Sequence, residues 1–328
     1  MNHRWAKGLL EEMGIDVNVV YWARTNFARS SVLAALENVA GVQTVVCVAL
    51  AQVLDQLAEA DLLVLSDCSP GDARAILDVV NAPQSRLRAV HFLTAGRDGF
   101  ASAGALREDI LVSGPEGAIA KPVAEHALAL ALALNRQLLP AFQAQRSRRW
   151  DRSMAADAVS LEGRTALIVG TGPIGREIGV LARAFGMNPV GVTRTPMAHA
   201  EFDSVHGLDD LQRLIPDADL IVLCIALSVL TRHLMGAREF ALCRDTAVIV
   251  NVGRGGLIDQ AALEAALRGA KIRAAGLDVT DPEPLPDGHS LWSAPNLLIT
   301  THYSGIGSQR ADALIGASAA RAAERLGQ

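Results

Sequence analysis

One stretch decides the fold of this chain: Leu167-Ile-Val-Gly170-Thr-Gly172-Pro-Ile-Gly175. Its apolar run is typical of a buried strand, and residues 176–185 continue the Gly-x-Gly-x-x-Gly turn as a helical pattern. In such a unit the first glycine permits a tight turn, the second lets backbone approach a pyrophosphate, and the third allows close packing of helix on strand. The pyrophosphate lies on free N–H groups at the positive end of the helix dipole. A glycine turn without a ligand is the alternative, but the flanking strand and helix favour a dinucleotide site.

Length and composition limit the class of protein. The 328 residues suffice for two domains with buried cores. Half of the residues are hydrophobic and 4% are aromatic, which suits a helix-rich α/β protein. The formal charge of −5 offers no basic surface for nucleic acid, and the basic run at residues 146–149 is typical of a solvated linker.

Nothing in the sequence indicates a metal site, a membrane segment or secretion. The four cysteines are scattered without metal-ligand spacing and are typical of reduced thiols. The N-terminal segment MNHRWAKGLLEEMG lacks the apolar core of a secretory signal. The apolar run at residues 127–134 is too short to span a bilayer. We therefore expect a cytoplasmic protein.

Apolar runs alternate with helical patterns before the glycine unit. The expected strands lie at residues 17–21, 42–48, 61–65 and 87–93, and the expected helices at 32–36, 51–58 and 72–80. Such alternation predicts parallel β-α-β units. The glycine-rich segment 94–99 is expected to be a loop.

A long Ala/Leu helix is expected to begin near Lys121 and to reach about Gln137. Pro122 suits a first helical position, and Glu125 complements the helix dipole. The helix is apolar nearly all round, so either a second layer of the same subunit or a partner subunit must cover it. Residues 140–160 are polar and are expected to be irregular.

A second series of strands follows the glycine unit. Further strands are expected at residues 189–193, 219–226, 246–252, 273–279 and 296–300, with helices at 259–268 and from residue 309. Six strands counted from the fingerprint match a full dinucleotide-binding sheet. The sequence therefore predicts an α/β fold of two Rossmann-like, doubly wound parallel sheets.

The end of the second strand of this sheet indicates which dinucleotide fits. NAD sites place an acid there for the ribose 2′-OH, whereas NADP sites place an arginine for the 2′-phosphate. Here the strand ends in Thr193, Arg194 and Thr195, and the first acid is Glu201. An arginine between two hydroxyls suits a phosphate. We predict a preference for NADP, with NAD possible if Arg194 is only a surface residue.

Three polar groups follow three consecutive strands. Arg254 lies in Asn-Val-Gly-Arg-Gly, Glu283 lies between two prolines, and His302 follows the next strand. Ligands of open α/β sheets bind at the carboxyl ends of the strands. Each residue alone has an ordinary structural explanation, but the three together favour an active site.

With these motifs the chain resembles the D-isomer-specific 2-hydroxyacid dehydrogenases over nearly its whole length. The resemblance rests on Thr94-Ala-Gly96, Val123-Ala-Glu-His126, the fingerprint, Thr231-Arg-His-Leu234, Asn251-Val-Gly-Arg-Gly255, Gly276-Leu-Asp-Val279, Pro282-Glu-Pro-Leu285 and Leu298-Ile-Thr-Thr-His302. The 29-residue step from Arg254 to Glu283 and the 19-residue step to His302 are similar to those of glyoxylate/hydroxypyruvate reductases in that family.

The resemblance implies a catalytic set. His302 would protonate the substrate carbonyl oxygen, and Glu283 would favour the protonated imidazole. Arg254 would bind the substrate carboxylate, whose other oxygen would meet the backbone N–H groups of Ala95 and Gly96.

The resemblance also implies the cofactor contacts and the domain plan. Asp278 would orient the nicotinamide carboxamide. The other cofactor-binding residues would be Gly170, Gly172, Pro173, Ile174, Gly175, Thr193, Arg194, Thr195, Ile225, Thr231 and Val252. A dinucleotide-binding Rossmann domain of residues 100–302 would be inserted into a flavodoxin-like substrate-binding domain of residues 1–99 and 303–328, with the active site in the cleft between them. The helix near Lys121 would form a homodimer interface.

The function implied is reduction of a small 2-oxo acid, such as glyoxylate or hydroxypyruvate, by an NAD(P)-dependent oxidoreductase. An NAD-dependent enzyme similar to phosphoglycerate dehydrogenase is one alternative, and a dinucleotide-sensing, corepressor-like interaction protein is another. The chain departs from the family pattern at Ala226-Leu-Ser228, where Pro-Leu-Thr is usual, and at Thr301, where proline is usual. Arg97 stands where the family often has an apolar residue. Contact with a second anionic group on a larger substrate is one alternative, and we expect instead that it faces solvent.

Overall fold

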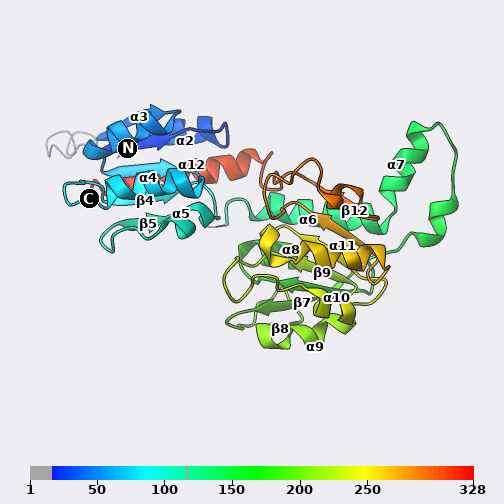
Figure 1. Ribbon diagram of the computed structural model, residues 1–328. Coiled ribbons are helices and arrows are strands. Elements are labelled where there is room, and N and C mark those ends of the chain that lie inside the picture. Colours follow the sequence, from blue (N-terminus) through cyan, green and yellow to red (C-terminus); the bar gives the residue numbers. More distant parts are fainter. Residues whose placement is uncertain (1–16, 116) are drawn as a thin grey trace, which may run out of the picture. The chain divides into compact units, whose positions relative to one another are not determined.

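A computed structural model describes residues 17–115 and 117–328, which divide into two units (Figure 1). The first unit extends to residue 118 and takes in residues 308–328, and the second is Ile119–Gly307. The chain thus leaves the first unit once and returns to it. The boundaries expected from the sequence, 99/100 and 302/303, fall before these two positions. The N-terminal segment in which no secretory signal was expected lies outside the described residues.

The first unit is built on a parallel sheet of five strands in the order β2-β1-β3-β4-β5. The strands are β1 (Val17–Trp22), β2 (Val42–Cys47), β3 (Leu62–Leu65), β4 (Ala89–Phe92) and β5 (Leu111–Ser113). This is the flavodoxin-like variant of the doubly wound sheet. The first four strands confirm the sequence-based expectation.

Helices cover both faces of this sheet. They are α2 (Arg29–Glu37), α3 (Leu50–Gln56), α4 (Pro70–Val80), α5 (Asp98–Ala103) and the C-terminal α12 (Gln309–Glu324). Ser69 caps α4 by accepting the N–H of Asp72, directly before a proline at the first helical position. Helix α12, red in Figure 1, packs closely on α2. Gly316 makes this approach possible, since an added Cβ would lie 2.4 Å from the carbonyl oxygen of Ser31.

Two elements of the first unit were not predicted. Strand β5 has three residues, none of them fully buried, and its apolar run is too short to be recognised as a strand. Helix α5 begins inside the segment expected to be a loop. Its first N–H groups, from Gly99 and Phe100, are bound by the carboxylate of Asp67 at 3.0 and 3.4 Å. This cap lies more than 30 residues away in sequence, where a local pattern does not reveal it.

The second unit is built on a parallel sheet of seven strands in the order β12-β11-β10-β9-β6-β7-β8. The strands are β6 (Thr165–Val169), β7 (Asn188–Thr193), β8 (Ser204–Gly207), β9 (Leu220–Leu223), β10 (Val248–Asn251), β11 (Ala274–Leu277) and β12 (Leu297–Ile299). From β6 the chain proceeds outward to β8 and then restarts at β9 on the other side of β6. The order therefore reverses between β6 and β9, where doubly wound sheets bind ligands.

Helices pack on both faces of this sheet as well. Helices α6 (Ala120–Asn135) and α8 (Pro173–Ala184) form one core with alternate strand residues, and α9 (Leu211–Leu214), α10 (Ala237–Leu242) and α11 (Gln260–Arg268) form the other. Gly276 in β11 permits the approach of α6, because an added Cβ would lie 3.0 Å from Leu130 Cβ. The second layer expected over the apolar helix near Lys121 is thus supplied by its own unit. Short 3-10 turns are η1 (Leu57–Glu59), η2 (Ser153–Asp157), η3 (Leu208–Asp210), η4 (Ile215–Asp217), η5 (Gly255–Leu257) and η6 (Ser290–Ser293).

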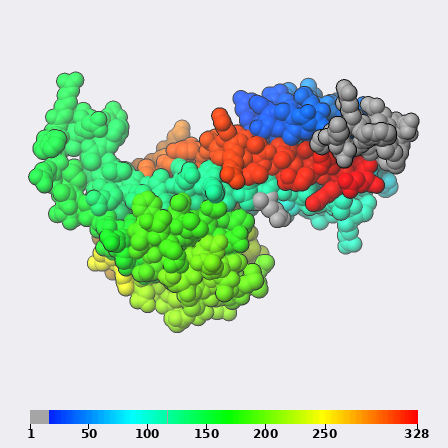
Figure 2. Space-filling view, turned by 180° about the vertical axis from the view of Figure 1, so that it is seen from behind, coloured from blue at the N-terminus to red at the C-terminus, as the bar shows by residue number. Residues whose placement is uncertain are grey.

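Two expectations for the second unit were wrong. Strand β8 makes the sheet seven-stranded, and this polar edge strand has no buried residue that would reveal it. Residues 140–160 are not irregular throughout, since α7 (Leu138–Arg146) enters the range and η2 follows it. Helix α7 stands out from the body of its unit in Figures 1 and 2, and Leu138 and Phe142 remain exposed on it. Among the described helices, none is both long and apolar enough to cross a membrane.

Candidate active site

The glycine turn between β6 and α8 has the geometry of a dinucleotide fingerprint. Gly170 has a φ of 115°, and an added Cβ would lie 2.8 Å from the backbone of Cys224. A Cβ added at Gly175 would lie 1.8 Å from the carbonyl oxygen of Gly170. At these two positions any side chain would collide with backbone atoms, so the turn requires glycine. By contrast, no described atom lies within 4 Å of a Cβ added at Gly172, which leaves room beside the turn.

The N-terminus of α8 is available to an anion. The helix has 12 residues with Pro173 at its start, and its N-cap Gly172 gives no side-chain cap. Its first N–H groups are therefore left for water or a ligand. The turn lies at the reversal between β6 and β9, and Ile174 is half-buried behind it. These residues fit the pyrophosphate of a dinucleotide.

The segment after β7 carries the residues expected to distinguish NADP from NAD. Thr193 ends the strand, and Arg194 and Thr195 are exposed. Arg194 has no hydrogen bond or ion pair with any residue that the structure describes. The nearest acid in sequence, Glu201, lies 3.9 Å from Arg176 Nε. An exposed guanidinium without a carboxylate partner suits a phosphate group.

The loops after β9 and β10 hold three of the residues expected to bind the cofactor. Thr231 is buried, and its hydroxyl both donates to the carbonyl of Ala226 at 2.8 Å and accepts the N–H of Ser228 at 2.8 Å. This hydroxyl fixes the loop in which the chain lacks the usual proline. Ile225 is half-buried after β9, and Val252 is buried after β10.

His302 and Glu283, from loops after β12 and β11, meet in a short hydrogen bond. His302 Nδ1 lies 2.5 Å from Glu283 Oε1, and both side chains are a little under half exposed. The hydrogen bond to Glu283 raises the pKa of His302, while partial burial and the positive charge of Arg254 oppose the shift without cancelling it. The structure thus brings together the expected proton donor and the carboxylate that favours its protonated form.

The turn after β10 orients Arg254. The buried side chain of Asn251 donates to the carbonyl of Arg254 at 2.9 Å and accepts the N–H of Gly253 at 3.0 Å. Arg254 Nη1 donates to the carbonyl of Gly253 at 2.7 Å. A Cβ added at Gly255 would lie 2.0 Å from the backbone of Thr280, so the turn packs directly against the segment after β11. Arg254 therefore lies at the same sheet edge as the His302–Glu283 pair.

Asp278 engages the loop that carries His302. Its buried carboxylate accepts the Thr300 hydroxyl at 2.7 Å and the N–H groups of Tyr303 and Ser304 at 3.2 and 3.1 Å. Its backbone carbonyl accepts the N–H of His302 at 2.8 Å. Burial acts to raise the pKa of Asp278, but the hydrogen bonds from Ser304 and Thr300 lower it below its ordinary value. Asp278 is thus an ionised clamp, a role that the sequence did not indicate.

In the first unit, the loop expected to bind the substrate carboxylate follows β4. Thr94 Oγ1 accepts the N–H of Asp67 and donates to the carbonyl of Gly96, both at 3.2 Å, and Ala95 is exposed. Arg97 lies with its guanidinium carbon 4.7 Å from the centre of the Phe92 ring and is exposed, as expected.

The chain is similar to known proteins over most of its length. The profile described as "D-isomer specific 2-hydroxyacid dehydrogenase, NAD binding domain" matches residues 128–304. A D-3-phosphoglycerate dehydrogenase from Methanocaldococcus jannaschii is 34% identical over 268 residues, which cover 81% of this chain and 50% of that protein. The match thus spans half the length of that relative. A glyoxylate reductase from Aeropyrum pernix is 34% identical over 223 residues, which cover 66% of this chain and 67% of that protein.

A solved structure supports the same comparison. The D-isomer specific 2-hydroxyacid dehydrogenase from Xanthobacter autotrophicus Py2, in complex with NADPH and MES, superimposes with a TM-score of 0.76 and 26% sequence identity. The superposition covers 95% of this chain and 94% of that one.

Proposed function

The chain belongs to the D-isomer specific 2-hydroxyacid dehydrogenase family, and we propose that it reduces a small 2-oxo acid, such as glyoxylate or hydroxypyruvate, with NADP(H). The observation that carries this proposal is the 2.5 Å hydrogen bond between His302 and Glu283 at the sheet edge that also holds Arg254. Reduction of a 2-oxo acid needs a proton donor for the carbonyl oxygen and a cation for the carboxylate. The similarity to a glyoxylate reductase supports this substrate class.

The chain's own groups account for the proton in this reaction. A bound nicotinamide dinucleotide supplies or accepts the hydride. Since Nδ1 of His302 is engaged by Glu283, Nε2 holds the proton that passes to the carbonyl oxygen. The carboxylate of Glu283 favours the imidazolium. In the reverse direction neutral His302 accepts the hydroxyl proton of the 2-hydroxy acid.

Binding of the substrate carboxylate is assigned to Arg254, whose planar guanidinium matches a carboxylate in two parallel hydrogen bonds. The resemblance to the family also assigns the N–H groups of Ala95 and Gly96 to this carboxylate. The hydrogen bonds of Asn251 hold the backbone at Arg254, and the bond from Nη1 to the Gly253 carbonyl restrains its side chain, which reduces the conformational freedom lost on binding.

The preference for NADP rests on Arg194, which is exposed without a partner among the described residues. The complex of a related dehydrogenase with NADPH supports it. The other expected cofactor residues, including Asp278 for the carboxamide, are proposed from the family resemblance. The free first turn of α8 supports a pyrophosphate at Gly172.

One experiment tests the proposal. Oxidation of NADPH and NADH is followed at 340 nm with glyoxylate, hydroxypyruvate, pyruvate and 3-phosphohydroxypyruvate as substrates. Turnover of the small 2-oxo acids with NADPH supports the proposal. Turnover of the phosphorylated acid alone with NADH favours the second candidate, a phosphoglycerate dehydrogenase-like enzyme, to which the match with the Methanocaldococcus jannaschii protein points. Dinucleotide binding without turnover of any acid favours a sensing protein.

We also propose a homodimer through the region that begins at α6 and continues into α7. Leu138 and Phe142 on α7 and Trp150 beyond it are exposed apolar side chains that a partner subunit would cover. Light scattering should give twice the chain mass of 34.6 kDa, and substitution of Leu138 and Phe142 by aspartate should give the monomer mass.

We propose that the protein is located in the cytoplasm, because its four free cysteines suit a reducing compartment.

A further inference from the structure

His126 on α6 contacts the clamp formed by Asp278 but lies outside the set of residues assigned to the reaction. Its Nε2 lies 2.9 Å from Thr300 Oγ1 and 3.6 Å from Asp278 Oδ1. Its ring meets the ring of Tyr303 edge-on, with centroids 5.1 Å apart. The side chain is 16% exposed, so water competes little for these contacts. His126 therefore links α6 to the ends of β11 and β12.

The hydrogen-bond directions in this network follow from its chemistry. The carboxylate of Asp278 is ionised and only accepts, so the single hydroxyl proton of Thr300 points to Asp278 Oδ1 at 2.7 Å. The oxygen of Thr300 is then an acceptor towards His126, and Nε2 of His126 must carry a proton. His126 thus donates a hydrogen bond to the Thr300 hydroxyl, which in turn donates to the carboxylate of Asp278.

The same network fixes the backbone at His302. This residue has a φ of 55°, a conformation that residues other than glycine seldom adopt. Three consecutive N–H groups, from residues 302 to 304, are accepted by the carbonyl and the carboxylate of Asp278. The position of Asp278 therefore sets the direction in which the imidazole leaves the backbone.

We propose that His126 is a positioning residue for the reduction: through Thr300 and Asp278 it holds the His302 backbone in the left-handed conformation that directs the imidazole to Glu283. The inference rests on the proposed role of His302 as proton donor. The groups that face His126 are Asp278, Thr300 and Tyr303, and those whose charges act on His302 are Glu283, Arg254 and Asp278.

The test compares His126→Leu with His126→Gln. Leucine removes the donor, whereas the glutamine amide places an N–H near the position of Nε2. His126→Leu should lower kcat about 10- to 100-fold, as misplacement of a catalytic group does. The basic limb of its kcat–pH profile should move to lower pH, because a displaced imidazole loses part of its bond to Glu283. His126→Gln should retain kcat within about threefold and keep the wild-type pH profile, since one donor is conserved.

A second variant removes the acceptor of the same hydrogen bond. Thr300→Val should reproduce the loss of kcat and the pH shift, and it carries the test if His126→Leu does not fold. In the double variant the losses should not add, because both substitutions break one pathway. Wild-type kcat and pH profile in His126→Leu or in Thr300→Val, equal losses in His126→Leu and His126→Gln, or additive losses in the double variant would each overturn the proposal.

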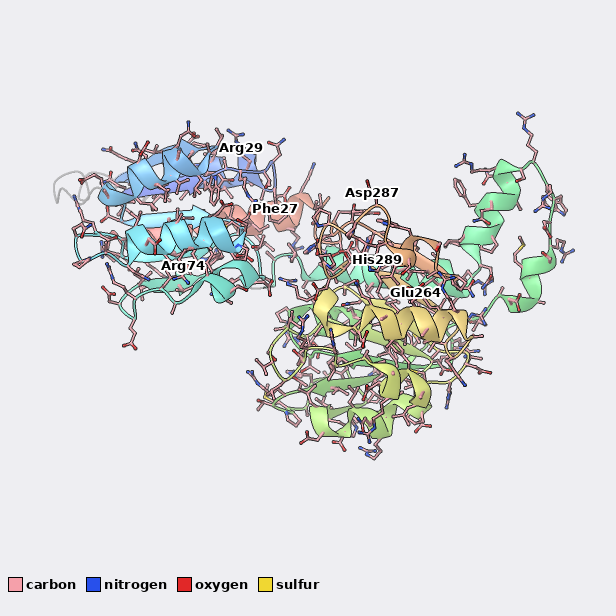
Figure 3. All side chains as sticks on the ribbon, in the orientation of Figure 1. Phe27, Arg29, Arg74, Glu264, Asp287 and His289 are labelled. Atoms are coloured by element: carbon pink, nitrogen blue, oxygen red, sulfur yellow. The ribbon has the colours of Figure 1, made fainter. Side chains whose placement is uncertain are left out.

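Two parallel variants separate this result from other causes. His289, labelled in Figure 3, accepts the N–H of Leu291. It lies beside α11, because the hydroxyl of the next residue, Ser290, donates a hydrogen bond to Glu264 of that helix. His289→Leu removes an imidazole and a hydrogen bond from the same unit and should leave the pH profile unchanged. His302→Gln tests the proposed function itself. Normal reduction by His302→Gln overturns that function, whereas loss in His302→Gln with an intact His126→Leu enzyme overturns only the role of His126.

Discussion

Replacement of Glu283 by glutamine tests the electrostatic basis of the proposed proton transfer. The substitution keeps the shape of the side chain and removes its charge, which lies 2.5 Å from Nδ1 of His302. Two charges ~4 Å apart attract by about 1 kcal/mol in water and about 4 kcal/mol near a protein surface. Both side chains are more than a third exposed, so the lower figure of about 1 kcal/mol applies, which is about fivefold in an equilibrium constant.

The sign of the effect follows from the role of His302. Reduction needs the protonated imidazole, and the bond to Glu283 raises its pKa above the ordinary value of 6.5. In Glu283→Gln the pKa of His302 should fall back towards that value, so the basic limb of the kcat–pH profile for reduction should move to lower pH. At pH 8 reduction should be up to about fivefold slower, whereas oxidation of the 2-hydroxy acid below pH 7 should suffer less.

The assay is kcat against pH in both directions, with the cofactor saturating. Glu162→Gln is the matched control. Glu162 is exposed and precedes β6, so this variant loses the same carboxylate charge at a position away from His302. A Glu283→Gln profile that superimposes on the wild-type profile would refute the reasoning, whatever the change in the absolute rate.

Three further predictions concern the cofactor, the substrate and the fold. Arg194→Ser should lower kcat/KM for NADPH about 10- to 100-fold, the worth of a charge-assisted hydrogen bond, and leave the NADH value unchanged; equal losses with both cofactors would contradict an NADP role. Arg254→Lys should raise the KM for the 2-oxo acid about tenfold or more because the paired geometry is lost, and an unchanged KM and kcat would reassign the carboxylate site. Gly175→Ala should destabilise the protein by about 1–3 kcal/mol in urea unfolding, because its Cβ would lie 1.8 Å from Gly170 O; unchanged stability would show that the turn relaxes freely.

The fold was predictable wherever burial produces a continuous run or a regular repeat of apolar residues in the sequence. The central strands β6, β9 and β10 are buried on both faces and appear as continuous apolar runs. The edge strands β5 and β8 lack that burial, and α7 buries only Ala144 among its nine residues. These elements depend on neighbours that a local pattern does not contain.

The residues of the candidate site were predictable where they follow the carboxyl ends of strands. Parallel strands place their carboxyl ends at one edge, so Arg254, Glu283 and His302 could be grouped from the sequence alone. The bond between His126 and Thr300 joins residues 174 positions apart. A histidine on an apolar helix gives no sign of that partner. The role of Asp278 as a clamp was not predicted for a related reason. Its oxygens accept backbone N–H groups, and nearly every residue type carries such a group, so the sequence does not mark the partners.

The most direct measurement of the central claim is a single-turnover rate of NADPH oxidation with glyoxylate for wild-type protein and for His302→Gln. Nucleotide binding is measured separately by fluorescence titration. If His302 supplies the proton, the variant should bind NADPH as tightly as wild type and lose about 10²- to 10⁴-fold in rate. An unchanged rate in a variant that still binds the nucleotide would remove His302 from the chemistry, and with it the proposed mechanism.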